Sequence, residues 1–366
     1  MNGCFENDKI GAQTAIALPA FLSASAKLLA WADTGGNMKR MILSRSLLLI
    51  MVATLAIPAS ARPPEFPAPD REMMVPVAGG RVYVRINGKL DGNRLPVIVS
   101  HRGPGGTHGS YRDLIELSDD RAVILYDQLD SGRSDHSGKT ANWTVARFVG
   151  ELDAIRNALG VKRWHVVGHS WGGTIALEYA ASRPPALAGV VLASPLVSTK
   201  SWIADANFLR TKLAPTTQAV LTRCDTDRPP EKSACDEASK AFYAAFNRRT
   251  TVVPQAFKAH HPDDRGFNPV LYNYMWGASE FVSTGTLKTY DGEPLLARLD
   301  GRRTLFLTGQ YDEARPETTL LFAGRVKDAE VAVVPGAAHA VMTDRPDETT
   351  AILRAWLRRQ DDMTSD

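Results

Sequence analysis

Short apolar runs rich in β-branched residues alternate with stretches of helical periodicity along much of this chain, over residues 81–196 and again over 303–358. In the helical stretch at 145–159, apolar side chains recur at steps of three and four residues. Strands that alternate with helices predict an α/β fold whose sheet is mainly parallel. The predicted strands are residues 81–86, 95–101, 121–127, 164–169, 189–194, 304–309 and 329–335.

This rhythm breaks between residues 197 and 292. Aromatic residues are dense there, as in FYAAF and YNYMW, and no run typical of a parallel strand occurs. We interpret this segment as a mostly helical cap inserted into the sheet domain. The expected organisation is an upstream segment plus signal peptide at 1–61, a first core part at 62–196, the cap at 197–292 and a second core part at 293–366.

Residues 38–61 have the pattern of a secretory signal peptide. Small residues up to Ala61 supply a cleavage site, and the apolar run at 46–57 follows three basic residues, Lys39, Arg40 and Arg45. The alternative, a transmembrane anchor, needs about 20 apolar residues, and this run is shorter. We therefore expect a periplasmic or secreted protein that keeps no stable membrane anchor after cleavage.

Residues 1–37 precede the expected signal peptide, so we expect translation to begin at Met38 or Met41. The apolar stretch at 14–32 is interrupted by proline and lysine. We interpret it as upstream coding sequence or disorder, with a second membrane segment as the alternative. Loss of residues 1–61 lowers the net charge from +3 to +1, and no basic stripe remains, so nucleic acid is not an expected partner.

Two cysteines, Cys224 and Cys235, remain after removal of the signal peptide. An oxidising compartment favours a disulfide between them, whereas the cytosol would keep two free thiols. The expected disulfide therefore depends on export.

The stretch VVGHSWGG at 166–173 places Gly168, Ser170 and Gly172 in the pattern G-x-S-x-G. The pattern directly follows a predicted strand and directly precedes a predicted helix, where such a turn exposes the serine hydroxyl above the sheet. The N-terminus of the following helix favours developing negative charge. We predict that Ser170 is a catalytic nucleophile; the alternative is an ordinary strand-to-helix turn.

A serine nucleophile needs a histidine to take its proton and an acid to hold that histidine. In this kind of fold the chain order is serine, acid, histidine. Asp312 follows the strand at 304–309, and His339 lies in the loop after the strand at 329–335. Both fall at carboxyl ends of parallel strands, where such sheets place their sites. Glu313 is an alternative acid.

The reaction also needs hydrogen-bond donors for an oxyanion. One expected donor is the backbone N–H of Trp171, and the other comes from the loop HRGPGG at 101–106. Glycines in that loop allow backbone N–H groups to approach a substrate closely. A plain Gly-Pro turn is the alternative.

Six stretches of the sequence together resemble the proline iminopeptidases, and are most similar to the branch that contains the tricorn-interacting aminopeptidase. They are HRGPGG (101–106), DQLDSGRSD (127–135), GHSWGGTIALEYA (168–180), LASPLVSTKSWIADANFLRTKL (192–213), SEFVSTGTLKTYD (279–291) and GQYDE (309–313). The resemblance covers most of residues 95–345. It implies an α/β-hydrolase fold with a helical cap, and an enzyme that removes N-terminal residues, often proline, from short peptides.

The resemblance also implies roles for individual residues. Glu280, in the stretch SEF, matches the cap glutamate that holds the free α-amino group of the substrate. A cationic amine in a closed pocket needs such a carboxylate, because an unpaired buried charge is costly. The alternative for Glu280 is a salt bridge to a neighbouring Lys or Arg. The expected catalytic triad and oxyanion donors are Ser170, Asp312 and His339, with the N–H groups of Gly103 and Trp171.

The chain departs from the family pattern at three places. The family usually has glycine where Arg102 and Asp130 stand, and we expect these opposite charges to pair across the mouth of the site. The cap stretch FYAAFNRR at 242–249 lacks the acidic residue that the family often carries near it. This absence predicts weaker recognition of an amine, and leaves an amide or ester as an alternative substrate.

We therefore predict an exported serine aminopeptidase that works through an acyl-enzyme. No metal or other cofactor is expected, because the chain has neither H-E-x-x-H nor clustered Cys and His residues. The expected partner is a short peptide or a small amide or ester. An esterase, amidase or lactonase on the same scaffold is the alternative, since a fold does not fix its substrate, and a non-catalytic binding module is a third hypothesis.

Overall fold

The computed structural model describes residues 67–250 and 263–363. The predicted upstream segment and signal peptide, residues 1–61, lie outside the described residues. In the part of the chain that is described, no helix combines the length and the apolar character needed to cross a membrane.

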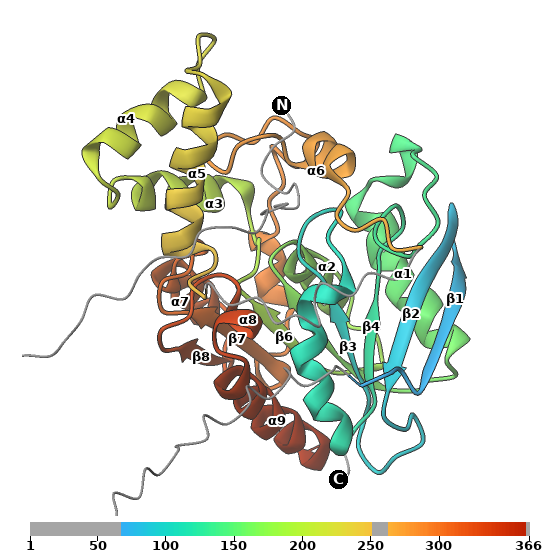
Figure 1. Ribbon diagram of the computed structural model, residues 1–366. Helices are drawn as coiled ribbons and strands as arrows, with labels where there is room; N and C mark the ends of the chain where they lie inside the picture. The colour runs from blue at the N-terminus through green and yellow to red at the C-terminus, as the bar shows by residue number, and fades with distance from the viewer. Residues whose placement is uncertain (1–66, 251–262, 364–366) are drawn as a thin grey trace, which may run out of the picture. The chain divides into compact units, whose positions relative to one another are not determined.

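The described residues form an eight-stranded sheet in the order β1-β2-β4-β3-β5-β6-β7-β8 (Figure 1). Strands β1 and β2 are antiparallel to each other, β2 is antiparallel to β4, and all pairs from β4 to β8 are parallel. This arrangement confirms the predicted α/β class. The strands are β1 (Arg71–Val77), β2 (Gly80–Asn87), β3 (Val97–Ser100), β4 (Val123–Tyr126), β5 (Trp164–His169), β6 (Leu187–Ala193), β7 (Thr304–Gly309) and β8 (Glu330–Val334).

Seven of these strands coincide with predicted ones, and β1 is the addition. Its sequence REMMVPV has few β-branched residues and half of it faces solvent, so the apolar run typical of a buried strand is absent. Its conformation comes from pairing with β2 across a tight turn at Ala78 and Gly79, in a register that aligns Val77 with Gly80. Pairing with a neighbour, rather than local pattern, therefore defines this edge strand.

Side chains of the central strands alternate between two cores. Ile98, Val166 and Phe306 pack with the helices of one face, while Val99, Val167 and Leu307 pack with those of the other. Helices α1 and α2 lie on one side of the sheet, and α9 lies on the other side (Figure 1). The helices of the first face are α1 (Val145–Ala158), α2 (Trp171–Ala181) and α7 (Pro316–Gly324). Those of the second face are η1 (His108–Asp119), α8 (Val341–Asp344) and α9 (Pro346–Met363).

The segment between β6 and β7 includes four described α-helices. An isolated antiparallel bridge between Ser198 and Asp291 joins the points where the chain leaves the sheet and returns to it. A disulfide links Cys224 at the end of α4 to Cys235 in α5, with 5.9 Å between the two Cα atoms. The helices are α3 (Thr199–Arg210), α4 (Pro215–Cys224), α5 (Lys232–Phe246) and α6 (Pro269–Met275).

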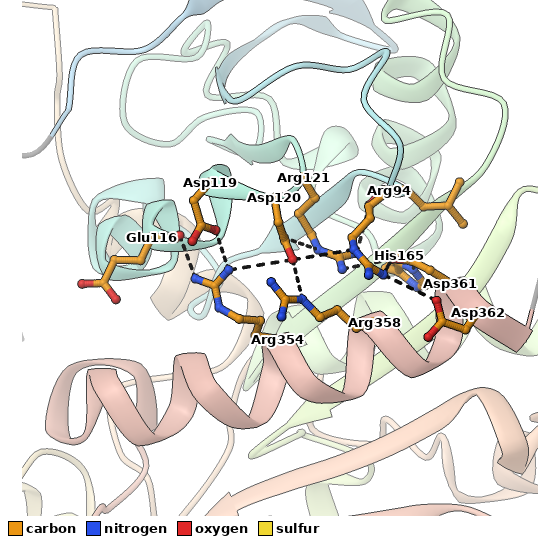
Figure 2. Close-up of polar contacts among 11 residues, drawn as sticks. Arg94, Glu116, Asp119, Asp120, Arg121, His165, Arg354, Arg358, Asp361 and Asp362 are labelled. Carbon is orange, nitrogen blue, oxygen red and sulfur yellow. Dashed lines mark hydrogen bonds and ion pairs between the residues drawn. The ribbon is translucent and has the colours of Figure 1, made fainter.

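An ionic network binds the C-terminal helix α9 to the amino ends of the strands, with the carboxylates of Asp120 and Asp361 each shared among several guanidinium groups (Figure 2). The side chain of Arg121 is fully buried and donates to Asp361 at 3.0 Å. Asp361 also accepts a hydrogen bond from Nε2 of His165 at 2.8 Å, and Arg94 lies 3.3 Å from it. A second carboxylate, Asp120, contacts Arg358 at 2.7 Å.

This network contributes more to the stability of the fold at neutral pH than at acidic pH. Burial lowers the pKa of His165, so the folded protein keeps its imidazole neutral. Burial alone would raise the pKa of Asp361, but hydrogen bonds and charges from His165 and Arg121 outweigh it and lower that pKa. Both groups bind protons more readily in the unfolded chain, so their contribution to stability is lost as pH falls, first below about 6.5 for the histidine and then below about 4 for the carboxyl group.

The network leads to a stability prediction. Asp361→Asn should lower the free energy of unfolding by about 3 kcal/mol, because it removes the main counter-charge of the buried Arg121. The neighbouring Asp362, whose side chain is 77% exposed and 3.7 Å from Arg94, provides the control, and Asp362→Asn should change stability by less than about 0.5 kcal/mol. Urea unfolding of both variants measures the difference, and equal values would contradict the assignment.

Candidate active site

Ser170 lies between β5 and α2 in a backbone conformation that residues other than glycine rarely adopt. Its φ is 58° and its ψ is −118°. Such a conformation costs about 1–3 kcal/mol, and it persists only where the surrounding structure enforces it. The side chain is 8% exposed and stands at the N-terminus of α2, where a developing negative charge is stabilised.

The two glycines of the motif are required because neighbouring backbone lies too close for a side chain. A Cβ atom on Gly172 would lie 2.1 Å from the carbonyl oxygen of Ser100, in the adjacent β3. A Cβ atom on Gly168 would lie 2.1 Å from the carbonyl oxygen of Gly172. Strand β5, the turn and α2 therefore pack at a distance that only glycine permits.

The carboxyl ends of β7 and β8 bring Asp312 and His339 together. Nδ1 of His339 lies 2.9 Å from Oδ1 of Asp312, and both side chains are buried. Four further donors hold the carboxylate in place: the hydroxyl groups of Ser194 and Thr308 and the backbone N–H groups of Gly309 and Ala314. A carboxylate with this many donors can fix both the orientation and the tautomer of the imidazole.

The two acidic candidates occupy different sides of the same imidazole. Asp312 contacts Nδ1, whereas Oε1 of Glu313 lies 3.5 Å from Nε2 of His339. Only a group on Nδ1 leaves Nε2 free to exchange a proton with a serine. Geometry therefore favours Asp312 over Glu313 as the triad acid.

Neighbouring carboxyl groups determine the basicity of His339. Burial by itself lowers the pKa of this imidazole, but the charges of Glu313 and Asp312 and the hydrogen bond to Asp312 outweigh burial. The net effect raises the pKa of His339 above its usual value. Arg102 opposes this rise, so its positive charge lies near enough to interact with the imidazole.

A buried chain of hydrogen bonds links the loop at 101–106 to His339. The hydroxyl group of Tyr111 accepts a hydrogen bond from the backbone N–H of Arg102 at 2.8 Å and contacts Nδ1 of His169 at 2.7 Å. The other nitrogen of His169 lies 2.8 Å from the carbonyl oxygen of His339. Burial keeps the pKa of His169 well below its usual value, so this histidine is neutral and serves as a fixed link.

The two expected oxyanion donors are free within the described part of the chain. Neither the N–H of Gly103 nor that of Trp171 donates a hydrogen bond there. Trp171 is itself immobilised, because its indole donates to Gln128 at 2.9 Å and packs edge-on against Phe148. Both N–H groups are therefore available, and their role in an oxyanion hole stays a prediction.

Glu280 is held by neutral donors from three helices of the cap, α3, α5 and α6. Its carboxylate accepts hydrogen bonds from Tyr272 at 2.6 Å, from the indole of Trp202 at 3.2 Å and from Tyr243 at 3.3 Å. Within the described ranges it forms no salt bridge with Lys or Arg, so the alternative of a basic partner gains no support. The ring of Trp202 also packs edge-on against His339, with centroids 5.3 Å apart.

Glu313 is a site residue whose role the sequence did not indicate. Its side chain is 3% exposed, Nδ2 of Asn247 donates to Oε1 at 2.7 Å, and Oε2 has no partner among the described residues. Burial raises the pKa of Glu313, and the nearby carboxylate of Glu280 adds to the rise. Asp312 and Glu313 therefore both lie beside His339, and Glu313 has an oxygen without a partner among the described residues. The only available signal was its position next to Asp312 in GQYDE.

The expected pairing of Arg102 with Asp130 is wrong. Asp130 is buried and accepts hydrogen bonds within its own loop region, from the indole of Trp143 at 2.7 Å and the backbone N–H of Gly138 at 2.8 Å. Arg102 instead points to the cap, where Nη1 lies 3.4 Å from Oδ1 of Asn247. Local donors satisfy Asp130, so it needs no cation from another loop.

The described residues hold no group of three or more His, Cys, Asp or Glu side chains that could bind a metal ion. The fold, the serine turn and the Asp-His pair define this chain as a serine hydrolase of the α/β-hydrolase class. In agreement, residues 96–346 match the family model described as "alpha/beta hydrolase fold".

The particular family follows from its relatives. Proline iminopeptidase of Heyndrickxia coagulans is 35% identical over 288 residues, covering 78% of this chain and 98% of the relative. That of Levilactobacillus brevis is 29% identical, covering 81% and 99%. The crystal structure of proline iminopeptidase from Mycobacterium smegmatis superposes with a TM-score of 0.73 at 30% identity, covering 81% and 100%. The chain belongs to the proline iminopeptidase family, and is a proline iminopeptidase-like aminopeptidase.

The site geometry predicts a change in pH dependence. Glu313→Gln removes a carboxyl group whose ionised form stabilises protonated His339, so the pKa of the imidazole should fall. Because the base must be neutral to act, the acidic limb of kcat/KM should move to lower pH. The control is Glu317→Gln, since the side chain of Glu317 is 66% exposed and pairs with Arg315. An acidic limb that stays in place in Glu313→Gln would contradict this electrostatic link.

Proposed function

We propose that this enzyme releases single N-terminal residues, proline foremost, from short peptides. One observation carries the proposal: the buried Oε2 of Glu313 has no partner among the described residues and lies in a side chain next to His339, with Glu280 close by. A buried polar atom without a partner needs an explanation. The ammonium group of a peptide N-terminus would supply both the missing donor and the opposite charge.

The position of the two glutamates supports removal of one residue at a time. In a peptide, a single Cα atom separates the terminal amine from the first carbonyl carbon. An enzyme that attacks this carbonyl must therefore hold the amine directly beside its nucleophile and base. Glu313 contacts the imidazole edge itself, and Trp202 contacts both Glu280 and His339.

The proposed chemistry is that of a serine hydrolase with an acyl-enzyme intermediate. Oγ of Ser170 attacks the first carbonyl carbon while Nε2 of His339 takes the hydroxyl proton and Asp312 stabilises the imidazolium. The oxygen that becomes negative faces the N–H groups of Gly103 and Trp171. The C–N bond then breaks, and His339 returns the proton to the leaving amine. Water attacks the acyl-enzyme with the same base, and the free amino acid departs.

The amine-anchor role can be tested on two substrates. Glu280→Gln should lower kcat/KM for a proline arylamide about 100-fold, because an ammonium group loses its charged partner, which costs about 2.7 kcal/mol. Hydrolysis of a short acyl ester, which carries no amine, should change only a few-fold.

The matched control is Glu237→Gln, since Glu237 lies in the cap helix α5 with a side chain that is 73% exposed. Labelling of Ser170 by a fluorophosphonate reports that the nucleophile is intact in each variant. If the ester falls as much as the arylamide, Glu280 is structural. If the wild-type enzyme hydrolyses esters but no aminoacyl arylamide, the enzyme is an esterase rather than an aminopeptidase.

We also propose that the protein is exported by its leader at 38–61. The disulfide between Cys224 and Cys235 supports this, because such bonds persist in oxidising compartments. Expression of the full chain in a Gram-negative host should yield a periplasmic protein that begins at Arg62. Edman sequencing of the periplasmic fraction checks the cleavage point, and deletion of residues 46–57 should retain the protein in the cytoplasm. An uncleaved cytoplasmic wild-type protein would refute export.

A further inference from the structure

Two arginines from different parts of the chain lie at the border between the cap and the catalytic loops. Arg102 belongs to the loop after β3, and Nη1 of its guanidinium lies 3.4 Å from Oδ1 of Asn247. Arg248 directly follows Asn247 after the end of α5. A core loop and the cap thus each contribute one cation to the same place.

The backbone around Arg248 is fixed against the catalytic loops. The carbonyl oxygen of Phe246 accepts hydrogen bonds from the N–H groups of Glu313 at 3.0 Å and His339 at 3.1 Å. The carbonyl oxygen of Asn247 accepts one from the N–H of Ala340 at 2.7 Å. Because these bonds tie the end of α5 to the triad loops, Arg248 keeps a defined position relative to His339.

Neither guanidinium forms a salt bridge within the described ranges, and the sequence TVVPQAFKAHHP of residues 251–262 contains no Asp or Glu. Desolvation and the charge of Arg102 lower the pKa of Arg248, and the carboxylate of Asp344 opposes them, so the two arginines are close enough to repel each other even with this acid nearby. An arginine pair that forms no salt bridge is a place for an external anion.

The two arginines and the two glutamates give the site a charge polarity. The amide of Asn247 lies between Arg102 and Glu313, since its oxygen faces Arg102 and its nitrogen donates to Glu313 at 2.7 Å. One amide group therefore lies between a positive and a negative side chain. The ammonium and carboxylate groups of a dipeptide are about 6 Å apart, a span that follows from consecutive Cα atoms at 3.8 Å.

We propose that Arg102 and Arg248 bind the free α-carboxylate of the residue that leaves, which makes the enzyme selective for dipeptides with an unblocked C-terminus. This inference rests on the proposed aminopeptidase function, with the amine held at Glu280 and Glu313. The scissile amide then lies between the two charged ends, over Ser170. A longer peptide places a neutral amide at the arginines and loses both ionic contacts.

The test compares prolylglycine, prolylglycine amide and Pro-Asp amide on the full chain. The wild-type kcat/KM should be about tenfold higher for prolylglycine than for its amide, and this ratio should fall to about one in Arg102→Gln and drop several-fold in Arg248→Gln. A ratio cancels any effect of the substitutions on the chemical step that both substrates share. The control is Arg249→Gln, which changes the same charge one residue further on, where the guanidinium stacks on Tyr311 at 4.1 Å; this variant should keep the wild-type ratio.

The outcomes separate the two proposals. If the wild-type enzyme cleaves a proline arylamide but shows no preference for the free acid, or if both arginine variants keep that preference, the carboxylate site is overturned while the aminopeptidase function stands. A preference for Pro-Asp amide over prolylglycine that Arg102→Gln removes would assign the pair to an acidic side chain and also overturn it. If no proline substrate of any kind is cleaved, the proposed function itself fails.

Discussion

The hydrogen bond between His339 and Asp312 depends on the parallel pairing of β7 and β8. Their register aligns Gly309 with Val334, so the loops that follow the two strands begin side by side. Neither loop would hold its residue alone, because the carboxylate of Asp312 takes donors from β7, from the end of β6 and from its own loop. The backbone of His339 is held by the chain that runs from Tyr111 through His169 to its carbonyl oxygen. Parallel strands, each contributing one loop at the same edge, are thus the condition for the whole site.

The cap completes this site rather than merely covering it. The end of α5 accepts hydrogen bonds from Glu313, His339 and Ala340, and Asn247 contacts both a carboxylate and a guanidinium. Charged groups at this border are expensive to bury, and several of them lack partners of opposite sign within the described residues. Such an arrangement is poor for stability and suited to a charged ligand. The strained backbone of Ser170 has the same character, since function rather than stability explains it.

At the opposite ends of the parallel strands the ions are paired: Arg121 has Asp361, Asp120 has several arginines, and α9 closes the network. His165 and Ser170 stand at the two ends of one short strand, β5, so a single element connects the region that holds the fold together with the region that does chemistry. Ion pairs at the amino ends of the strands can therefore offset the free-energy cost of the strained backbone at their carboxyl ends.

Local pattern in the sequence determined the alternation of strands and helices, the serine turn and the order of the triad candidates, because each depends on residues that are close in the chain. Seven strands and the turn around Gly168, Ser170 and Gly172 could be predicted in this way. The edge strand β1 could not, since pairing with β2 defines it. The sequence also could not indicate that Glu313 faces Nε2 of His339, or that Arg102 turns to Asn247 rather than to Asp130. Those contacts join residues from loops and a cap helix far apart in the chain, and only the packing of the tertiary structure decides which charges meet and which are left without a partner.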